Sequence, residues 1–471
     1  MGAFTMKACT KNIFRDKRLF ILHIALQGCL RAHDVQYGLT ADTGGHIRYV
    51  LELAAATGAR PEVTRVEIAT RSFREPGFDP IHAQPRERLD GNCDIIRFAS
   101  NRTGYVAKEQ LGAESRSYSA ALVRYLRRLP VLPDIVHAHY ADAGQIALWL
   151  KQELGLPFVF TAHSLGRLKQ VSGAGKACKA VRNDVITDAL RRRIQTEEAV
   201  LAGASLVIAS SRDEAEQQLG LYANHDSRRT CVIAPGSSLD DTAPAPALAR
   251  IDGILRALLH KPDKPPILAL ARPVRRKNLA TLLQAYAADS QLRERANLVL
   301  FTGSRQSRNR ESSENAAVRQ ELHGLIERCG LHGHVALPAS HAPGDVSAIY
   351  RWAARRRGVF ANVAYSEPFG LTLIEAARCG LPLVATNRGG PCNIVGEHGS
   401  GVLVDPHDEA AIGNALCRLL ANRDLWSQCA TAAMQSAAHF DWHRHTATYL
   451  QQLRTLLERE RAVSWRRRST A

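Results

Sequence analysis

Short apolar runs that alternate with helical patterns are the feature that most constrains the fold of this chain. Helical patterns, such as 44–57, 115–129 and 142–154, lie between many of the runs in the first half. Such alternation predicts βαβ units and a parallel sheet covered by helices on both faces. The candidate strands are LFILHIAL (19–26), RVEIAT (65–70), CDIIRFA (93–99), DIVHAHY (134–140), FVFTAH (158–163), SLVIAS (205–210) and TCVIAP (230–235).

A proline-punctuated stretch over 237–266 interrupts this series, and a second series follows it. The chain has 471 residues, which is more than one core usually supports. We therefore expect two doubly wound α/β domains, 1–240 and 241–445, with the ligand site in a cleft between them. We expect a last helix, 446–471, to cross back to the first domain. The second series comprises PILALA (266–271), NLVLFTG (297–303), HVALPA (334–339), GVFANV (358–363), PLVATN (382–387) and GVLVD (401–405).

The net charge of +17 favours anionic partners such as phosphorylated metabolites and nucleotides. The RRR clusters at 191–193, 355–357 and 466–468 lack interleaved aromatic residues, so we expect no nucleic-acid partner. The ten cysteines show no CxxC pairing, which predicts reduced thiols rather than a zinc site or disulfides. His23 and Gln27 interrupt the N-terminal apolar stretch, so we interpret it as a first strand and not a signal peptide. We expect no membrane span and a cytoplasmic location.

Residues that directly follow strands are the first candidates for a ligand site in such sheets. Gly44 and Gly45 precede a helical pattern, where they serve either as a turn or as a close approach of backbone N–H groups to phosphate. His163 ends an apolar strand and is followed by the cations Arg167 and Lys169. The pair His137 and His139 lacks a third ligand nearby in the sequence, so we interpret it as structural.

The second half carries the strongest candidates. Arg272 and Lys277 follow a strand and suit a diphosphate, with solvated charge as the alternative. In SEPFGLTLIEAARCG (366–380), Pro368 and Gly370 precede a helix whose first N–H groups have no partner within the helix. Two carboxylates beside a phosphate site, from Glu367 and Glu375, suit the hydroxyl groups of a sugar. The pattern therefore predicts a binding site for a sugar attached to phosphates.

Several longer motifs resemble those of a known family. SEPFGLTLIE is similar to the E-x7-E motif of retaining glycosyltransferases of family 4, which have the GT-B fold. Together with DTGGHIRYVLELA, HAHYADAG, FTAHSLGR, LARPVRRKN and FGLTLIEAARCGLPLVATNRGGP, it resembles the sucrose-phosphate synthase family from about residue 19 to 450. Sucrose synthase, the near relative, typically differs from this chain at AHSLGR.

The resemblance implies glucosyl transfer with retention from a nucleoside-diphosphate glucose, with UDP-glucose as the first candidate, to fructose 6-phosphate. It places Arg272 and Lys277 on the departing diphosphate, Glu367 on glucose hydroxyls and Glu375 on the ribose. It implies His163 as a catalytic residue over the glucose, and both glycines as an approach loop. The remaining implied donor contacts are Phe369, Gly370 and Leu371, and the implied acceptor contacts are Gly45, His46, Lys108, His163, Lys169 and one of Arg192 or Arg193.

The chain departs from the family pattern at His46, where glutamine is usual, and at Gly104, Val274, Ser304 and the segment 176–184. No DxD motif is visible, so we expect no required metal or cofactor and at most a stimulatory effect of Mg²⁺. The sequence leaves open the donor base, uracil, adenine or guanine, and another acceptor such as free fructose. A further alternative is a non-catalytic binding protein. The presence of all four charged residues of the motifs, Arg272, Lys277, Glu367 and Glu375, argues against it. The phosphorylated product would call for a separate sucrose-phosphate phosphatase.

Overall fold

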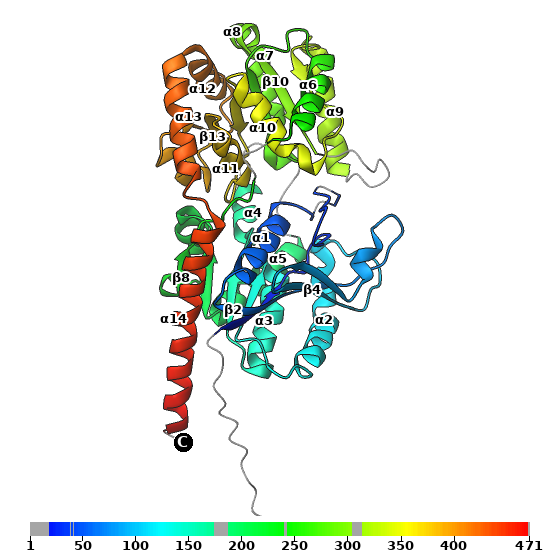
Figure 1. Ribbon diagram of the computed structural model, residues 1–471, viewed down its shortest axis with the longest axis vertical. Helices are drawn as coiled ribbons and strands as arrows, with labels where there is room; N and C mark the ends of the chain where they lie inside the picture. The colour runs from blue at the N-terminus through cyan, green and yellow to red at the C-terminus, as the bar shows by residue number, and fades with distance from the viewer. Residues whose placement is uncertain are drawn as a thin grey trace, which may run out of the picture.

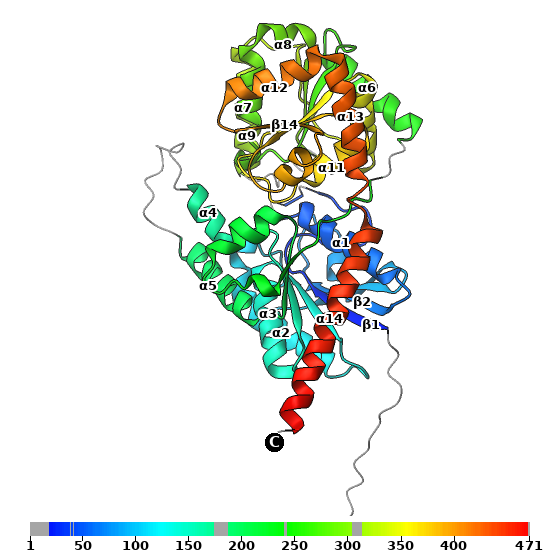
Figure 2. The ribbon, with the colours of Figure 1, turned by 90° about the vertical axis from the view of Figure 1, so that its left-hand side faces the viewer.

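The structure is a computed structural model that describes residues 18–37, 39–40, 42–173, 187–239, 243–303 and 313–469. Two α/β domains lie one above the other, and the last helix runs along the lower, N-terminal domain (Figures 1 and 2). Ser304 and the segment 176–184, two of the departures noted above, fall outside the described residues.

The first sheet has the strand order β3-β4-β2-β1-β5-β6-β7-β8. Every neighbouring pair is parallel except β3 and β4, which form an antiparallel edge. The order reverses between β1 and β5, so loops after these strands meet at one edge. The strands are β1 (Leu19–Ile24), β2 (Val63–Arg71), β3 (Arg86–Asp90), β4 (Cys93–Phe98), β5 (Ile135–His139), β6 (Phe158–Thr161), β7 (Leu206–Ala209) and β8 (Thr230–Val232).

Helices cover both faces of this sheet. One buried cluster joins the sheet to the helices α2, α3 and α5, and a second cluster joins the opposite face to α1 and the final helix α14. Leucine side chains of α14 are buried there against the N-terminal domain. The helices are α1 (Gly45–Gly58), α2 (Leu111–Leu126), α3 (Ala141–Leu154), α4 (Gly166–Gly173), α5 (Asp188–Gly203) and α14 (Trp442–Ser469).

The second sheet is wholly parallel, with the order β11-β10-β9-β12-β13-β14. Its two faces are covered by α6, α10, α11 and α13 on one side and by α7, α8, α9 and α12 on the other. The strands are β9 (Pro266–Leu270), β10 (Asn297–Phe301), β11 (Val335–Ala336), β12 (Val359–Asn362), β13 (Leu383–Thr386) and β14 (Gly401–Val404). The helices are α6 (Ala245–Leu258), α7 (Leu279–Ala288), α8 (Ser290–Arg295), α9 (Ser313–Arg328), α10 (Val346–Arg355), α11 (Leu371–Arg378), α12 (Glu409–Ala421) and α13 (Arg423–Ala437).

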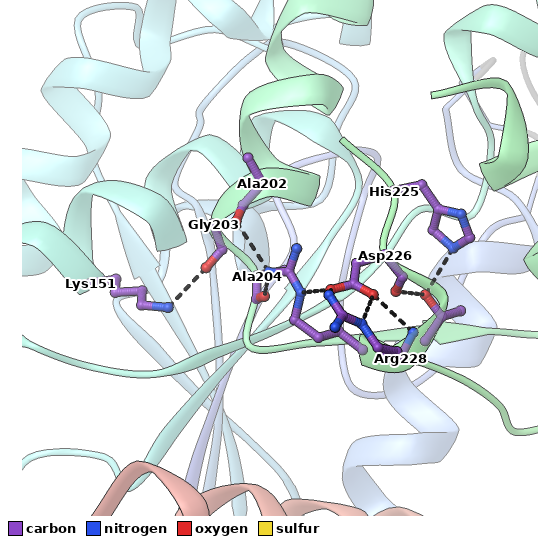
Figure 3. Close-up of polar contacts among 9 residues, drawn as sticks. Lys151, Ala202, Gly203, Ala204, His225, Asp226 and Arg228 are labelled. Atoms are coloured by element: carbon purple, nitrogen blue, oxygen red, sulfur yellow. Dashed lines mark hydrogen bonds and ion pairs between the residues drawn. The ribbon is translucent and has the colours of Figure 1, made fainter. Parts of the chain in front are cut away.

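The C-terminus of α5 is held by cations from neighbouring segments (Figure 3). Lys151 of α3 donates to the carbonyl of Gly203 at 2.9 Å, and Arg229 donates to the carbonyls of Ala202 and Ala204 at 3.1 and 2.7 Å. These contacts satisfy carbonyls that have no partner within the helix and place positive charge at its negative end. They fix α5, whose other end carries candidate site residues.

The eight cysteines among the described residues all lie outside disulfides, as their irregular spacing predicts. No helix in the described part of the chain combines the length and the apolar character that crossing a membrane requires.

Candidate active site

Glu367 lies just beyond β12 and forms an ion pair with Lys277. Asn362, the last residue of β12, also donates to the Glu367 carboxylate at 3.3 Å. Burial alone would raise the pKa of Glu367, but Lys277 and the nearby Arg276 lower it below its usual value. The carboxylate is therefore ionised and available as an acceptor for hydroxyl groups.

The helix after Glu367 begins beyond Pro368 and Gly370, as the sequence predicts. Helix α11 starts at Leu371, with Gly370 as its N-cap at φ 104°, a conformation that favours glycine. The Phe369 side chain is buried in the core of the domain, with its ring centroid 5.9 Å from that of Phe440. Of the three predicted donor contacts at 369–371, Phe369 can therefore offer only its backbone.

Three cations gather at the end of β9. Arg272, Arg276 and Lys277 influence one another electrostatically, and Arg272 also interacts with the charge of Glu367. The sequence interpretation selected Arg272 and Lys277 but missed Arg276, although it stands in the same RRK run. The cluster can neutralise a diphosphate.

Neither Gly44 nor Gly45 is required by a positive φ, and Gly44 lies at a close approach to the second domain. Gly44 is extended, with φ −143° and ψ −157°, and Gly45 opens α1 without a positive φ. A Cβ atom on Gly44 would lie 3.2 Å from the Arg272 guanidinium carbon. Among the described residues, a Cβ atom on Gly45 would meet only the Leu371 side chain, at 3.8 Å. The loop thus brings the first domain against the cations and the helix start of the second.

His46 and Lys108 lie beside this loop. Burial, together with the charges of Arg272, Lys108 and Arg276, lowers the pKa of His46 to about 3, so its ring is neutral. Its buried Nε2 has no hydrogen-bond partner among the described residues. Lys108 Nζ pairs with Asp42 Oδ1 at 3.0 Å, which holds the amine at the entrance of the glycine loop.

Lys169 on α4 belongs to the same positive region. Partial removal from water and the charges of Arg193, Lys108 and Arg276 together lower its pKa to about 8, although the residue as a whole is exposed. Of the two α5 candidates, Arg193 is the one that acts on Lys169, whereas Arg192 is exposed.

Arg193 is itself committed to neighbouring protein groups. It donates to the carbonyl of Ser164 and to Glu197 Oε1, and its guanidinium lies 4.3 Å from the centroid of the Tyr140 ring. It therefore fixes the loop that follows His163 in addition to contributing charge.

His163 follows β6 in a left-handed conformation, with φ 56°. Its Nε2 atom lies 3.0 Å from Nδ1 of His139 on β5. Burial lowers the pKa of His163 to about 3, so the ring is neutral at physiological pH. Tyr49 packs against it edge-on, with 5.0 Å between ring centroids.

The structure brings a third histidine to His137 and His139, which lack a third ligand nearby in the sequence. His23 of β1 lies opposite His137 in the parallel register, and nitrogen atoms of the three rings lie within 4.8 Å of one another. Strand pairing, which the local sequence does not specify, creates this cluster.

Glu375 is engaged by residues of both domains. Arg48 of α1 forms an ion pair with its Oε1, and Tyr350 donates to Oε2 at 3.0 Å. Arg48 also pairs with Glu52 at 2.8 Å, and Trp442 Nε1 donates to Glu52 Oε2 at 2.7 Å. Burial raises the pKa of Glu375, while Arg48 opposes that rise. The sequence interpretation missed Arg48, for which the only local signal is its i,i+4 spacing to Glu52.

The fold is that of a two-domain glycosyltransferase. The family model for glycosyl transferases group 1 matches residues 252–436, and that for the glycosyl transferase 4-like domain matches residues 44–236. The two matches together cover most of the chain, which therefore belongs to the glycosyltransferases.

Within this class, the chain is most usefully compared with sucrose-phosphate synthases. It is 36% identical to sucrose-phosphate synthase from Spinacia oleracea over 97% of its own length and 49% of the relative's. The enzyme from Zea mays is 35% identical over 93% of this chain and 47% of the relative. The chain thus spans about half the length of these curated relatives.

Solved structures agree with the resemblance. Sucrose-phosphate synthase from Thermosynechococcus elongatus superposes with a TM-score of 0.75 at 26% identity, covering 94% of this chain and all of that one. The catalytic domain of starch synthase IV from Arabidopsis thaliana, at 17% identity, superposes with a TM-score of 0.67 over 94% of this chain and all of that one. The GT-B fold and the resemblance predicted from the motifs are confirmed.

Proposed function

We propose that the chain is a retaining hexosyltransferase of the sucrose-phosphate synthase type. It transfers glucose from a nucleoside-diphosphate glucose, with UDP-glucose as the first candidate, to fructose 6-phosphate. The products are sucrose 6-phosphate and the nucleoside diphosphate. The sequence relationship with sucrose-phosphate synthases supports this assignment.

The observation that carries the proposal is the presence of two groups of cations around one histidine-lined point between the domains. Arg272 and Arg276 act on His46 from the second domain, and Lys108 acts on it from the first. The charges of Lys108 and Arg276 both act on Lys169. One group suits the diphosphate of a donor and the other suits the phosphate of an acceptor. An unphosphorylated acceptor such as fructose would leave the second group without an anion.

The proposed reaction needs no nucleophilic carboxylate. The bond between the glucose anomeric carbon and the diphosphate breaks, and the acceptor hydroxyl forms its new bond on the same face. The proton of that hydroxyl passes to the departing diphosphate. Arg272, Arg276 and Lys277 stabilise the charge that develops there, and Glu367 orients glucose hydroxyls. Closure of the domains would exclude water and limit hydrolysis of the donor.

Product analysis tests the proposal directly. UDP-, ADP- and GDP-glucose are each incubated with fructose 6-phosphate or fructose, with EDTA or with Mg²⁺. We expect sucrose 6-phosphate from one donor, no comparable product from fructose, and turnover in EDTA because the cations supply the electrostatic stabilisation. Transfer to fructose at an equal rate would contradict the assignment. The phosphorylated product implies that a phosphatase acts next.

A further inference from the structure

A chain of buried histidines extends from the middle of the first sheet to His163. His23 Nδ1 lies 2.9 Å from His139 Nε2, and His139 Nδ1 lies 3.0 Å from His163 Nε2. His23 and His139 are fully or almost fully buried, with exposed fractions of 0% and 2%. Their rings are stacked at an interplanar angle of 13°.

Hydrogen bonds among the described residues engage every ring nitrogen of His23, His137 and His139 except His23 Nε2, which leaves one nitrogen and not three for a metal ion. Both nitrogens of the neighbouring His137 are engaged, Nδ1 with the Tyr449 hydroxyl and Nε2 with Thr161 Oγ1, each at 2.9 Å. Both nitrogens of His139 form hydrogen bonds to other histidines, one to His23 and one to His163. The spacing of 2.9 Å between His23 and His139 is that of a hydrogen bond.

Neutral rings make the chain directional. Burial lowers the pKa of His23 and His163 to about 3 and that of His139 well below its ordinary value. A neutral imidazole has one N–H donor and one acceptor nitrogen. The protons in the two hydrogen bonds therefore run all one way or all the other.

His23, the histidine furthest from His163 in this row, decides between the two directions. His23 Nε2 is buried and has no hydrogen-bond partner among the described residues. If the protons ran inward, this atom would be an N–H without an acceptor, which costs about 1–3 kcal/mol. If they run outward, it is a bare acceptor nitrogen, and an unsatisfied acceptor is better tolerated than an unsatisfied N–H. The outward direction is favoured, and it gives each of the three rings its proton on Nδ1.

We propose that His139 is a positioning residue that holds His163 in the tautomer with its proton on Nδ1, and that His23 fixes the tautomer of His139. His163 then presents a hydrogen-bond donor on the nitrogen that His139 does not engage. It acts as a donor to a sugar oxygen and not as a base. The catalytic consequence rests on the proposed function, whereas the tautomer itself does not.

The test combines histidine nitrogen NMR with kinetics on the full chain. In protein labelled with ¹⁵N-histidine, the variant His163→Gln identifies the signals of His163. We expect wild-type His163 to show a protonated Nδ1 and an unprotonated Nε2 without any substrate present. His139→Phe keeps the ring but removes the donor, so His163 should lose this fixed tautomer. His139→Asn offers an amide N–H near the place of Nδ1 and should retain it.

Kinetics then measure what the tautomer contributes to catalysis. Loss of one oriented donor predicts that kcat of His139→Phe falls about 10- to 100-fold with KM nearly unchanged, and that His139→Asn restores most of it. His137→Asn serves as the matched control, because His137 packs against His139 with 4.1 Å between ring centroids but has no bond to His163.

Each outcome decides a separate statement. A wild-type His163 protonated on Nε2 would overturn the proposal, and so would an unchanged tautomer in His139→Phe. A changed tautomer with full kcat would overturn its catalytic part. Absence of transfer by wild-type protein with every donor and acceptor would refute the proposed function while the spectra still decide the tautomer.

Discussion

At the residue scale, Arg275 and Arg276 are neighbours with different surroundings. Arg275 is 70% exposed and lies 3.8 Å from Glu321, whereas Arg276 acts on Arg272 and Lys277. We expect Arg276→Ala to lower kcat about 10-fold and Arg272→Ala or Lys277→Ala to lower it about 10²-fold, because each removes charge that stabilises the leaving diphosphate. Steady-state kinetics with Arg275→Ala as the control check this; equal rates in Arg275→Ala and Arg276→Ala would be the contrary result.

Glu367 and Glu375 should separate sugar binding from nucleotide binding. Glu367 is paired with Lys277 on the donor side, and Glu375 lies about one turn into α11 beside Arg48. We expect Glu367→Gln to reduce transfer strongly while the Kd of the free nucleoside diphosphate stays nearly unchanged. Glu375→Gln should weaken the free nucleotide as well. Calorimetric titration of the nucleotide into both variants decides, and equal losses would contradict the division of roles.

The pKa of Lys169 predicts a pH dependence for the acceptor. Because this pKa is lowered to about 8, the amine is charged below that pH and neutral above it. We expect kcat/KM for fructose 6-phosphate to fall as pH rises through about 8, since the free enzyme then loses a phosphate-binding charge.

The conservative variant supplies the control for this pH effect. In Lys169→Arg the guanidinium stays protonated, so the fall should disappear. The kcat/KM for the donor, measured with saturating acceptor, should not show it in either protein. The same fall in both proteins would assign the pH effect to another group.

Sequence reasoning predicted the position of residues that follow a recognisable strand, and it missed contacts between residues that are distant along the chain. Glu367, Arg272 and Lys277 each follow a recognisable strand, so their place at the sheet edge was predictable. Arg48 meets Glu375 327 positions away, in the other domain. His23 reaches His139 only through the pairing of β1 with β5. No local pattern encodes such contacts.

At the element scale, apolar runs predicted every strand of the two sheets except β3, the antiparallel strand at the edge of the first sheet. Its sequence, RERLD, carries alternating charges and lies at the sheet edge with alternate residues exposed. Arg86 and Arg88 instead pair with Asp94 of β4. An edge strand with charged side chains has no hydrophobic signature, because it needs to bury little and charges there discourage further pairing.

The start of α1 offers a test of the glycine loop. Gly45→Ala should not destabilise the fold, because its Cβ would make only an ordinary contact with Leu371 at 3.8 Å and Gly45 has no positive φ. We expect an unchanged or slightly higher Tm, since alanine favours the helix, with loss of most glucosyl transfer because the methyl group occupies substrate space. Calorimetry and activity per folded molecule check this. A large drop in Tm with preserved activity would mean that the glycine serves the fold alone.

At the scale of the whole molecule, the chain passes between the domains twice, near Gly236 and near Phe440. These two connecting segments contact each other. Ser237 N donates to the carbonyl of Phe440 at 3.1 Å, and a Cβ on Gly236 would lie 2.5 Å from Trp442 N. Trp442 in turn bonds Glu52, the partner of Arg48. The crossing region and the ion pair between Arg48 and Glu375 thus form one connected network.

This network predicts that Arg48 helps to hold the domains together. The Arg48–Glu375 pair is largely buried, with 21% and 4% of the side chains exposed, so removing one partner leaves an uncompensated charge. In Arg48→Met we expect less domain closure, seen as a larger radius of gyration by small-angle scattering of the unliganded protein. Hydrolysis of the donor should rise relative to transfer, because closure excludes water. Arg31→Met, which breaks an ion pair with Asp79 within the first domain, should change neither quantity. Equal radii and equal hydrolysis ratios for Arg48→Met and the wild type would show that closure does not depend on this pair.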